Sequence, residues 1–289
     1  MEICCNAKLN LSLDITGRRN DGYHYVDTVM QSVDLFDTLY IDSAEEDGIE
    51  LRSNLPFLPV DERNLVCRAA HLLAEAGGVT RRGVKAYIEK RIPVGAGLAG
   101  GSANAAGTLL ALRELWGLDI DDAELSALGL KLGADVPFCL SGGTARATGT
   151  GELLTPLKPF PRCFFVIAMP DTGVLTKEAF QLLDAKHGYE RPDTEALVAA
   201  IGAGDARAAA KRFVNVFETS GTCGAGDLTR KMLSLGAKGA ALTGSGSAVF
   251  GLFESHLEAE ACRLELIKEY RAWTARPVER GIYVKPRII

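Results

Sequence analysis

The sequence predicts an α+β protein that folds as two domains. Its 289 residues exceed the roughly 100–200 residues of an ordinary domain. Segments in which apolar and polar residues alternate, as in strands, are interspersed with segments whose apolar residues recur at helical spacing. Between two groups of such segments lies KPFP at 158–161, a composition typical of a linker. We therefore expect a first domain over residues 1–157 and a second over residues 158–289.

The first domain is expected to begin with a strand. In LNLSLDI, residues 9–15, the aliphatic side chains point to one face and the polar ones to the other, which predicts a half-buried strand. Its polar face carries Lys8, Asn10, Ser12 and Asp14. The Asp21-Gly22 pair predicts a turn, and residues 23–42 predict further strands. The remaining elements expected here are a helix over 62–76, a strand over 84–90, and helices over 102–116 and 121–132.

The second domain is expected to alternate strands and helices in a βαββαβ order. CFFVIAM at 163–169 predicts a buried strand. The elements expected after it are helices over 176–186 and 193–200, a strand pair formed by 241–244 and 248–253, a helix over 258–270, and a closing strand GIYVKP at 281–286.

Composition excludes several classes of protein. The net charge of −5 argues against a nucleic-acid partner, which requires a basic surface. The seven scattered cysteines include no CxxC pair, so neither a disulfide framework nor a zinc site is indicated. The N-terminus lacks the pattern of a signal peptide, and no apolar stretch approaches the roughly 20 residues of a membrane helix. We expect a cytoplasmic protein with no membrane partner.

The most informative segment is PVGAGLAGGSANAAG, residues 93–107, in which four glycines precede a predicted helix. Glycines at a helix start let the backbone approach an anion, above all a phosphate. Residues 95–100 match the dinucleotide pattern GxGxxG, but Pro93 separates them from the preceding strand and the nearest acid, Asp119, lies between two helices. A structural turn is the bland alternative, and it would need only one or two glycines.

A P-loop is also disfavoured. Gly95, Gly100 and Ser102 have the GxxxxGK[ST] spacing, but Gly101 occupies the lysine position. Without that lysine, the positive charge that the β- and γ-phosphates require must come from another segment.

The same stretch resembles the PxxxGLxxSSA-type phosphate loop of the kinases grouped as galactokinase, homoserine kinase, mevalonate kinase and phosphomevalonate kinase. Further segments resemble one branch of this superfamily, whose acceptor alcohol carries cytidine diphosphate. They are residues 7–31 (AKLNLSLDITGRRNDGYHYVDTVMQ), 61–70 (DERNLVCRAA), 132–138 (LGADVPF) and 243–253 (TGSGSAVFGLF). The resemblance covers nearly the whole chain in order. Ala99 and Ala103 depart from it, at positions where glycine and serine are common.

The resemblance implies a fold and a reaction. The first domain would be ribosomal protein S5 domain-2-like and the second ferredoxin-like, with the active site in the cleft between them. ATP would phosphorylate the tertiary hydroxyl at carbon 2 of a methylerythritol linked to cytidine diphosphate, in the non-mevalonate isoprenoid pathway. ATP is then the co-substrate and Mg²⁺ the metal, for which Ser102 is the candidate ligand. A monomer or weak homodimer is expected.

The resemblance also implies the binding residues. The phosphate loop would comprise Pro93, Val94, Gly95, Ala96, Gly97, Leu98, Ala99, Gly100, Gly101, Ser102, Ala103 and Asn104, with Asn64, Leu65 and Lys90 near the adenine and ribose. Tyr23 and Phe180 would sandwich the cytosine while His24 reads its edge. The other residues expected on the acceptor side are Asn10, Thr176, Gly244, Ser245 and Gly246.

Two residues are candidates for catalysis. Asp135 is a lone acid among apolar residues; it could be a helix cap, but a carboxylate in such surroundings needs a partner, and Lys8 could supply it. Lys8 taken alone could be a surface lysine. The resemblance implies that Asp135 deprotonates the hydroxyl and Lys8 neutralises developing charge. Open alternatives are another acceptor, such as homoserine or mevalonate, and a nucleotide-binding regulator without turnover; a hydrolase is disfavoured because no GxSxG motif is present.

Overall fold

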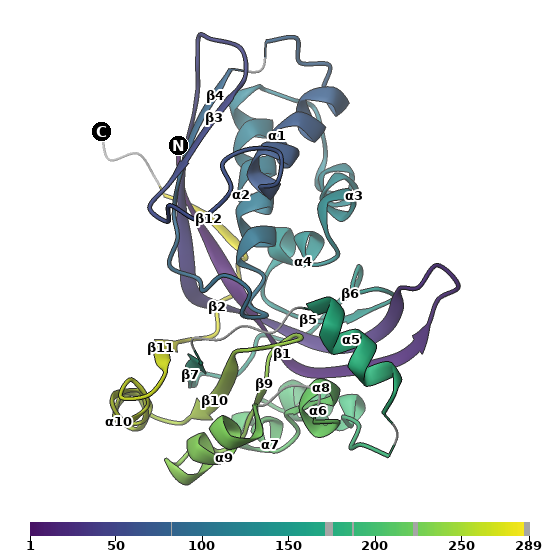
Figure 1. The fold of residues 1–289 in the computed structure, drawn as a ribbon, viewed down its shortest axis with the longest axis vertical. Helices are drawn as coiled ribbons and strands as arrows, with labels where there is room; N and C mark the ends of the chain where they lie inside the picture. The colour runs from purple at the N-terminus through teal and green to yellow at the C-terminus, as the bar shows by residue number, and fades with distance from the viewer. Residues whose placement is uncertain (82, 171–175, 187, 222–224, 286–289) are drawn as a thin grey trace.

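The computed structural model describes residues 1–81, 83–170, 176–186, 188–221 and 225–285, without the side chains of residues 176–178. It has the expected α+β composition, with two sheets that each carry their own helices (Figure 1). The larger sheet has the order β12-β1-β2-β4-β3, with β5, β6 and β8 attached beside it. The smaller sheet has the order β11-β7-β10-β9.

The larger sheet is organised by one long antiparallel hairpin. β1 (Glu2–Arg18) pairs with β2 (His24–Ser43) along nearly its whole length, with three register shifts. Residues 23–42 therefore form one long strand where several were expected, because the bulges bend it without ending it. The strands that pair around this hairpin are β3 (Ile49–Ser53), β4 (Val84–Glu89), β5 (Thr144–Thr148), β6 (Leu153–Pro156), β8 (Val214–Asn215) and β12 (Ile282–Val284).

Four helices lie on one face of the upper part of the larger sheet (Figure 1). They are α1 (Leu65–Ala76), α2 (Gly100–Leu115), α3 (Asp122–Leu132) and α4 (Val136–Ser141). α2 can approach β1 closely because its facing residues are small: a Cβ on Gly107 would lie 2.5 Å from the Cys5 sulfur. The start of α2 is consequently fixed against the strand that carries Lys8.

Two helix starts differ from the sequence prediction. α1 begins three residues later than expected, because the Asn64 side chain caps it by accepting a hydrogen bond from the Val66 amide (3.0 Å). α2 begins two residues earlier, at Gly100, so two of the four glycines belong to its first turn. The helix expected over 258–270 is α10 (His256–Leu266), which a Ser255–Glu258 capping box begins.

β1 is buried on both faces, and the expected half-buried strand is wrong on this point. Lys8 is 4% exposed and Asn10 3% exposed. The loop before α2 and the loop after β9 pack against this part of the strand: the Lys8 amide donates to the Leu98 carbonyl (3.2 Å), and the Asn10 amide donates to the Thr243 hydroxyl (2.9 Å). Alternation predicted which residues share a face, but not what covers that face.

The smaller sheet is antiparallel throughout and consists of β7 (Phe164–Met169), β9 (Ala240–Leu242), β10 (Val249–Phe253) and β11 (Arg271–Ala275). The strand pair expected at 241–253 is confirmed as β9 and β10. The helices of this half are α5 (Thr176–Asp184), α6 (Thr194–Gly202), α7 (Ala206–Ala210), α8 (Val216–Thr219), α9 (Gly226–Ser234) and α10.

The closing strand was assigned to the wrong sheet. GIYVKP at 281–286 contains β12, which pairs antiparallel with β1 of the larger sheet. The smaller sheet is closed by β11, which the sequence analysis did not predict. A five-residue strand with partly exposed side chains gives little periodic signal, so its pairing is decided by the surrounding fold.

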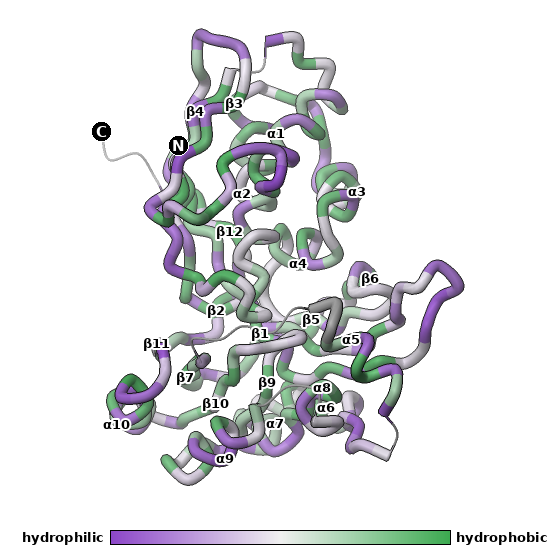
Figure 2. The backbone as a smooth tube through the Cα atoms, in the orientation of Figure 1, coloured by the Kyte–Doolittle hydropathy of each residue, from purple (hydrophilic) through white to green (hydrophobic). Residues whose placement is uncertain are grey.

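The apolar core follows the strands and the inner faces of the helices, while the loop between β1 and β2 is hydrophilic (Figure 2). Among the described residues, no helix is long and apolar enough to cross a membrane. The six cysteines in the described part of the chain are free and buried.

Candidate active site

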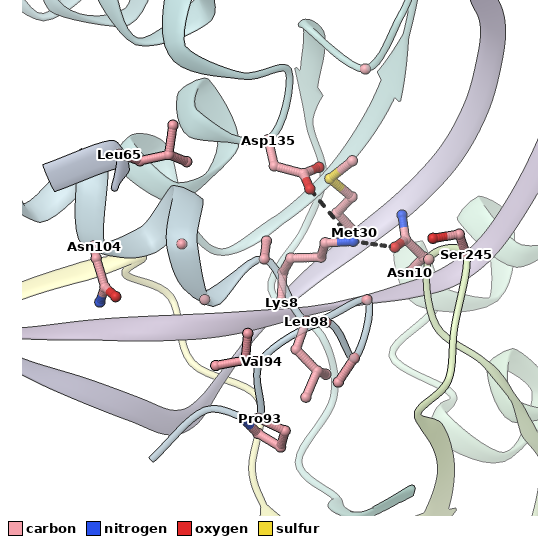
Figure 3. Close-up of a pocket in the computed structure, with 18 of the residues that line it drawn as sticks. Lys8, Asn10, Met30, Leu65, Pro93, Val94, Leu98, Asn104, Asp135 and Ser245 are labelled. Carbon is pink, nitrogen blue, oxygen red and sulfur yellow. Dashed lines mark hydrogen bonds and ion pairs between the residues drawn. The ribbon is translucent and has the colours of Figure 1, made fainter. Parts of the chain in front are cut away.

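A cavity of about 440 Å³ lies where the two halves of the molecule meet. From the first half it is lined by β1 and β2, the loop before α1, the loop between β4 and α2, and Asp135 at the start of α4. From the second half it is lined by Phe180, Phe217, Gly244 and Ser245. Figure 3 shows Lys8 projecting toward both Asp135 and Asn10.

Lys8 and Asp135, 127 positions apart in the sequence, come together in this cavity. The Lys8 ammonium lies 3.9 Å from the Asp135 carboxylate and also donates a hydrogen bond to the Asn10 amide oxygen (Figure 3). Lys8 is buried, whereas about a third of the Asp135 side chain (34%) is exposed. The cation is thus fixed in the wall while the carboxylate remains accessible to a ligand.

Asp135 occupies the cap position of α4, but its side chain makes no capping hydrogen bond. By contrast, Asp121, Asp193 and Asp205 all accept a backbone hydrogen bond at the starts of α3, α6 and α7. Structural capping therefore does not explain the Asp135 carboxylate. Its position at the cavity surface beside Lys8 is that of a group available for proton transfer.

A short hydrogen-bonded chain fixes the orientation of Asn10. Its amide nitrogen donates to the Thr28 hydroxyl (2.8 Å), which in turn donates to the Ser12 carbonyl (2.5 Å). Because the Thr28 proton is already given to that carbonyl, Thr28 can only accept from Asn10. The amide oxygen of Asn10 is left facing Lys8.

The glycine-rich loop wraps one end of the cavity. Gly95 (φ 71°) and Gly97 (φ 77°) adopt left-handed backbone conformations, and so does Ala99 (φ 56°), the residue immediately before α2. Gly100 and Gly101 present the first turn of α2 to the cavity. A 16-residue helix whose N-terminus faces a cavity provides amide donors and a positive dipole end for an anion.

The glycine-rich loop of the second half packs backbone against backbone on this loop. The Ala248 amide donates to the Ala96 carbonyl (3.2 Å). A Cβ on Gly97 would lie 2.2 Å from the Thr243 carbonyl oxygen. Gly244 and Ser245 line the cavity, but Gly246 does not. The two glycine-rich segments thus form one continuous wall from both halves.

Asn64, Leu65 and Lys90 lie together at the end of the cavity beside the loop. The Asn64 side chain is occupied by local bonds: it caps α1 and donates to the Pro59 carbonyl (2.7 Å). The Lys90 ammonium is buried and paired with Asp37, a fully buried carboxylate on β2. Asp37 is absent from the sequence-predicted site residues.

The opposite end of the cavity is aromatic. Phe180 lines it and packs edge to face on Phe217 (ring centroids 4.9 Å apart). His24 stacks on Phe180 (4.8 Å), and its Nε2 lies 2.7 Å from the Asp184 carboxylate. Tyr23 is 68% exposed and does not line the cavity, so it is not brought beside Phe180 as a second wall. The side chain of Thr176 lies outside the described part of the structure.

One further prediction concerns metal binding, and another concerns the phosphate loop. Ser102, the candidate Mg²⁺ ligand, and Ala103 lie in the first turn of α2 but do not line the cavity. Across the described residues, no cluster of three or more His, Cys, Asp or Glu side chains is placed to hold a metal ion.

The cavity residues that sequence reasoning missed include Thr28, Met30 and Phe217. These belong to no glycine or charge motif, and only the fold brings them to the site.

Comparisons with known proteins agree with this architecture. Residues 64–143 match the model of the GHMP kinases N terminal domain, and residues 225–272 match that of GHMP kinases C terminal. The chain is 40% identical over 273 residues to the 4-diphosphocytidyl-2-C-methyl-D-erythritol kinase of Clostridium tetani, covering 93% of this chain and 97% of that protein.

Solved structures give the same result. A crystal structure of 4-(cytidine 5'-diphospho)-2C-methyl-D-erythritol kinase superposes with a TM-score of 0.81 at 36% identity, covering 96% of this chain and 99% of that one. A homoserine kinase from Cytophaga hutchinsonii has a TM-score of 0.78 at 19% identity, covering 99% and 97%, which indicates a shared fold only. The chain belongs to the 4-diphosphocytidyl-2-C-methyl-D-erythritol kinase family, a family of ATP-dependent small-molecule kinases among the GHMP kinases.

Proposed function

We propose that this protein transfers the γ-phosphoryl group of ATP to the 2-hydroxyl of 4-(cytidine 5'-diphospho)-2-C-methyl-D-erythritol, in the non-mevalonate isoprenoid pathway. The observation that carries the proposal is that the Lys8–Asp135 pair lines the same cavity as the N-terminus of α2 and the aromatic rings of Phe180 and Phe217. One end of such a cavity suits a nucleotide triphosphate, and the other suits an acceptor that carries a base. The family relationship agrees with this division.

In the proposed reaction, the Asp135 carboxylate accepts the proton of the acceptor hydroxyl. The hydroxyl oxygen forms a bond to the γ-phosphorus while the bond from that phosphorus to the bridging oxygen breaks, and ADP leaves with the electron pair. The Lys8 ammonium, held by Asn10, stabilises the negative charge on the attacking oxygen. Positioning and electrostatic stabilisation are the main requirements of phosphoryl transfer, so few protein groups are needed.

We propose that the phosphates of ATP lie against residues 93–101 and the N-terminus of α2, with Asn64, Leu65 and Lys90 near the adenine and ribose. Asn104 lines the same end of the cavity. Ser102 and Ala103 do not line the cavity, and they are proposed to contribute from the first turn of α2. Mg²⁺ would enter with ATP and neutralise charge on its phosphates.

The acceptor is proposed to bind along the opposite wall. Phe180, supported by Phe217, offers a ring face on which cytosine can stack. His24, oriented by Asp184, would read the edge of the base. Tyr23, which does not line the cavity, would have to turn toward it to cover the base from the solvent side. The residues proposed to contact the rest of the acceptor are Asn10, Thr176, Gly244, Ser245 and Gly246.

The finer fold assignments are also proposals. The 4-1-3-2 order of the antiparallel strands in the smaller sheet supports a ferredoxin-like second domain. We propose an S5 domain-2-like first domain divided from it near residue 158, with β12 returning to the first. A cytoplasmic monomer or weak homodimer without nucleic-acid partners would suit a protein with a net charge of −5.

The test is ADP release by the purified protein against a panel of alcohols. We expect turnover with the cytidine-diphosphate-linked methylerythritol and little with free methylerythritol, homoserine or mevalonate. Turnover with homoserine or mevalonate instead would overturn the acceptor assignment. If the protein binds ATP but releases no ADP in the presence of any of these alcohols, it would instead be a nucleotide-binding regulator.

A further inference from the structure

A fully buried carboxylate lies beneath the phosphate loop. Asp37 is on β2, with 0% of its side chain exposed. Its Oδ1 accepts hydrogen bonds from the backbone amides of Arg91 (2.8 Å) and Ile92 (2.9 Å). Its Oδ2 accepts from the Lys90 ammonium and from the Asn104 side-chain amide (3.0 Å). Four donors thus converge on one acid that takes no part in the proposed proton transfer.

These donors flank the phosphate loop on both sides. Residues 90–92 directly precede the segment 93–101 that is proposed to contact the phosphates, and Asn104 follows this segment in α2, after the first turn of that helix. One carboxylate therefore ties the strand that enters the loop to the helix that leaves it. We infer that Asp37 is a positioning residue for nucleotide binding, which fixes both ends of the phosphate loop and the Lys90 ammonium. The inference rests on the proposed function in assigning this loop to ATP.

The geometry of Asn104 supports this role. Its amide oxygen accepts from Lys90 (3.1 Å), and its amide nitrogen donates to Asp37. Both polar ends of Asn104 are thus engaged, and only 3% of the residue is exposed, although it lines the cavity. Lys90, Asp37 and Asn104 form a closed triangle of hydrogen bonds, so movement of one member disturbs the other two.

The position of Lys90 links this triangle to the ligand. A Cβ on Gly100 would lie 3.0 Å from the Lys90 ammonium nitrogen, so this cation sits against the first turn of α2. An ammonium has three protons; Asp37 and Asn104 take two of them, and the third can serve a nucleotide at the cavity wall. This cation lies at the end of the cavity where the adenine and ribose of ATP are proposed to bind.

The competing explanation is that Asp37 serves only to stabilise the folded protein. The burial of its carboxylate alone does not support this explanation. Replacing a buried ion pair by apolar residues is often neutral or stabilising, because desolvation offsets the attraction. The two explanations differ in what an Asp37 substitution changes. A merely structural role lowers thermal stability and affects both substrates alike. A positioning role weakens nucleotide binding selectively.

The experiment compares Asp37→Asn with Asp34→Asn. Asp34 is the control: it lies three residues earlier on β2 and likewise accepts from a backbone amide and a cationic side chain, both of Arg276 (2.6 and 3.0 Å), but it is partly exposed and its donor does not flank the glycine-rich loop. Binding of a non-hydrolysable ATP analogue is measured by calorimetry below the melting temperature, and KM is measured for both substrates. Removing a residue that orients a metal ligand lowers metal affinity by about 10- to 100-fold. On the same scale, we expect Asp37→Asn to lower the affinity for the ATP analogue by about 10- to 100-fold.

We expect the acceptor KM of Asp37→Asn and both KM values of Asp34→Asn to stay within about twofold of wild type, which is below about 0.4 kcal/mol. Unchanged analogue affinity in a folded Asp37→Asn protein, or equal losses for both substrates, would overturn the inference. If Asp37→Asn does not fold, Asn104→Ala is the test. This variant removes the hydrogen bonds of Asn104 to Lys90 and Asp37, whereas Asp37 keeps its bonds to the Lys90 ammonium and to the amides of Arg91 and Ile92. Wild-type analogue affinity in that variant would equally overturn it. A wrong acceptor assignment would appear only in turnover, not in analogue binding.

Discussion

The contact between the two glycine-rich loops makes Gly97→Ala the sharpest test of the cavity wall. The new Cβ would lie 2.2 Å from the Thr243 carbonyl oxygen, at a backbone φ of 77°. The position of the new Cβ is fixed by the backbone of residue 97 and the carbonyl oxygen belongs to the backbone of Thr243, so no side-chain rotation can relieve the clash. Reaching even a 3.0 Å contact would require the loops to separate by about 0.8 Å. Thr243 also holds the Asn10 amide (2.9 Å), so the shift would reach the residue that orients Lys8.

The magnitude follows from this displacement. A misplacement of about 1 Å can lower a rate by about 100-fold when reacting groups must be aligned. We therefore expect kcat/KM of Gly97→Ala to fall by about 100-fold. The left-handed backbone should separately cost about 1–2 kcal/mol of stability.

Gly117→Ala separates the stability cost of a left-handed alanine from the effect of the steric clash with Thr243. Gly117 has a φ of 60°, but a Cβ there would meet no atom within 4 Å, and it lies beyond the far end of α2. It should lose similar stability while keeping wild-type kinetics. A coupled assay of ADP release and thermal melting would be run on both variants. Equal kinetics in the two, or a wild-type kcat/KM in Gly97→Ala, would refute the reasoning.

Three further predictions concern single residues. Asp135→Asn should lower kcat by about 10²–10⁴-fold, the range for a general base, because the amide cannot take up the proton of the hydroxyl; turnover near wild type would exclude its role. Ala99→Gly should raise the free energy of unfolding by about 1 kcal/mol, because Ala99 has a φ of 56°, and urea denaturation that gives no gain would contradict this. Phe180→Ala should raise the acceptor KM by about tenfold, since stacking on an aromatic ring is worth about 1–3 kcal/mol, while the ATP KM stays constant; the reverse pattern in steady-state kinetics would place the nucleotide at this wall.

The family could be predicted from the resemblance of its motifs, and the glycine-rich loop before a helix from local sequence. Local features suffice for the loop, because the glycines at 95–101 and the helix after them act through backbone conformation alone. The alternation at 9–15 likewise predicted that Lys8 and Asn10 share one face of a strand. Even the pairing of Lys8 with Asp135 could be suggested, since a lone acid among apolar residues needs a partner.

The tertiary structure decided what lies against each of these local elements. Periodicity describes one strand and carries no information about its neighbours, so β12 was placed in the wrong sheet and the polar face of β1 was taken as half exposed. Asp37 sits in an ordinary strand sequence, and only the approach of residues 90–92 and of α2 surrounds it with donors. The local sequence specifies which groups a segment offers, whereas long-range packing determines whether those groups meet a core, a partner or a ligand.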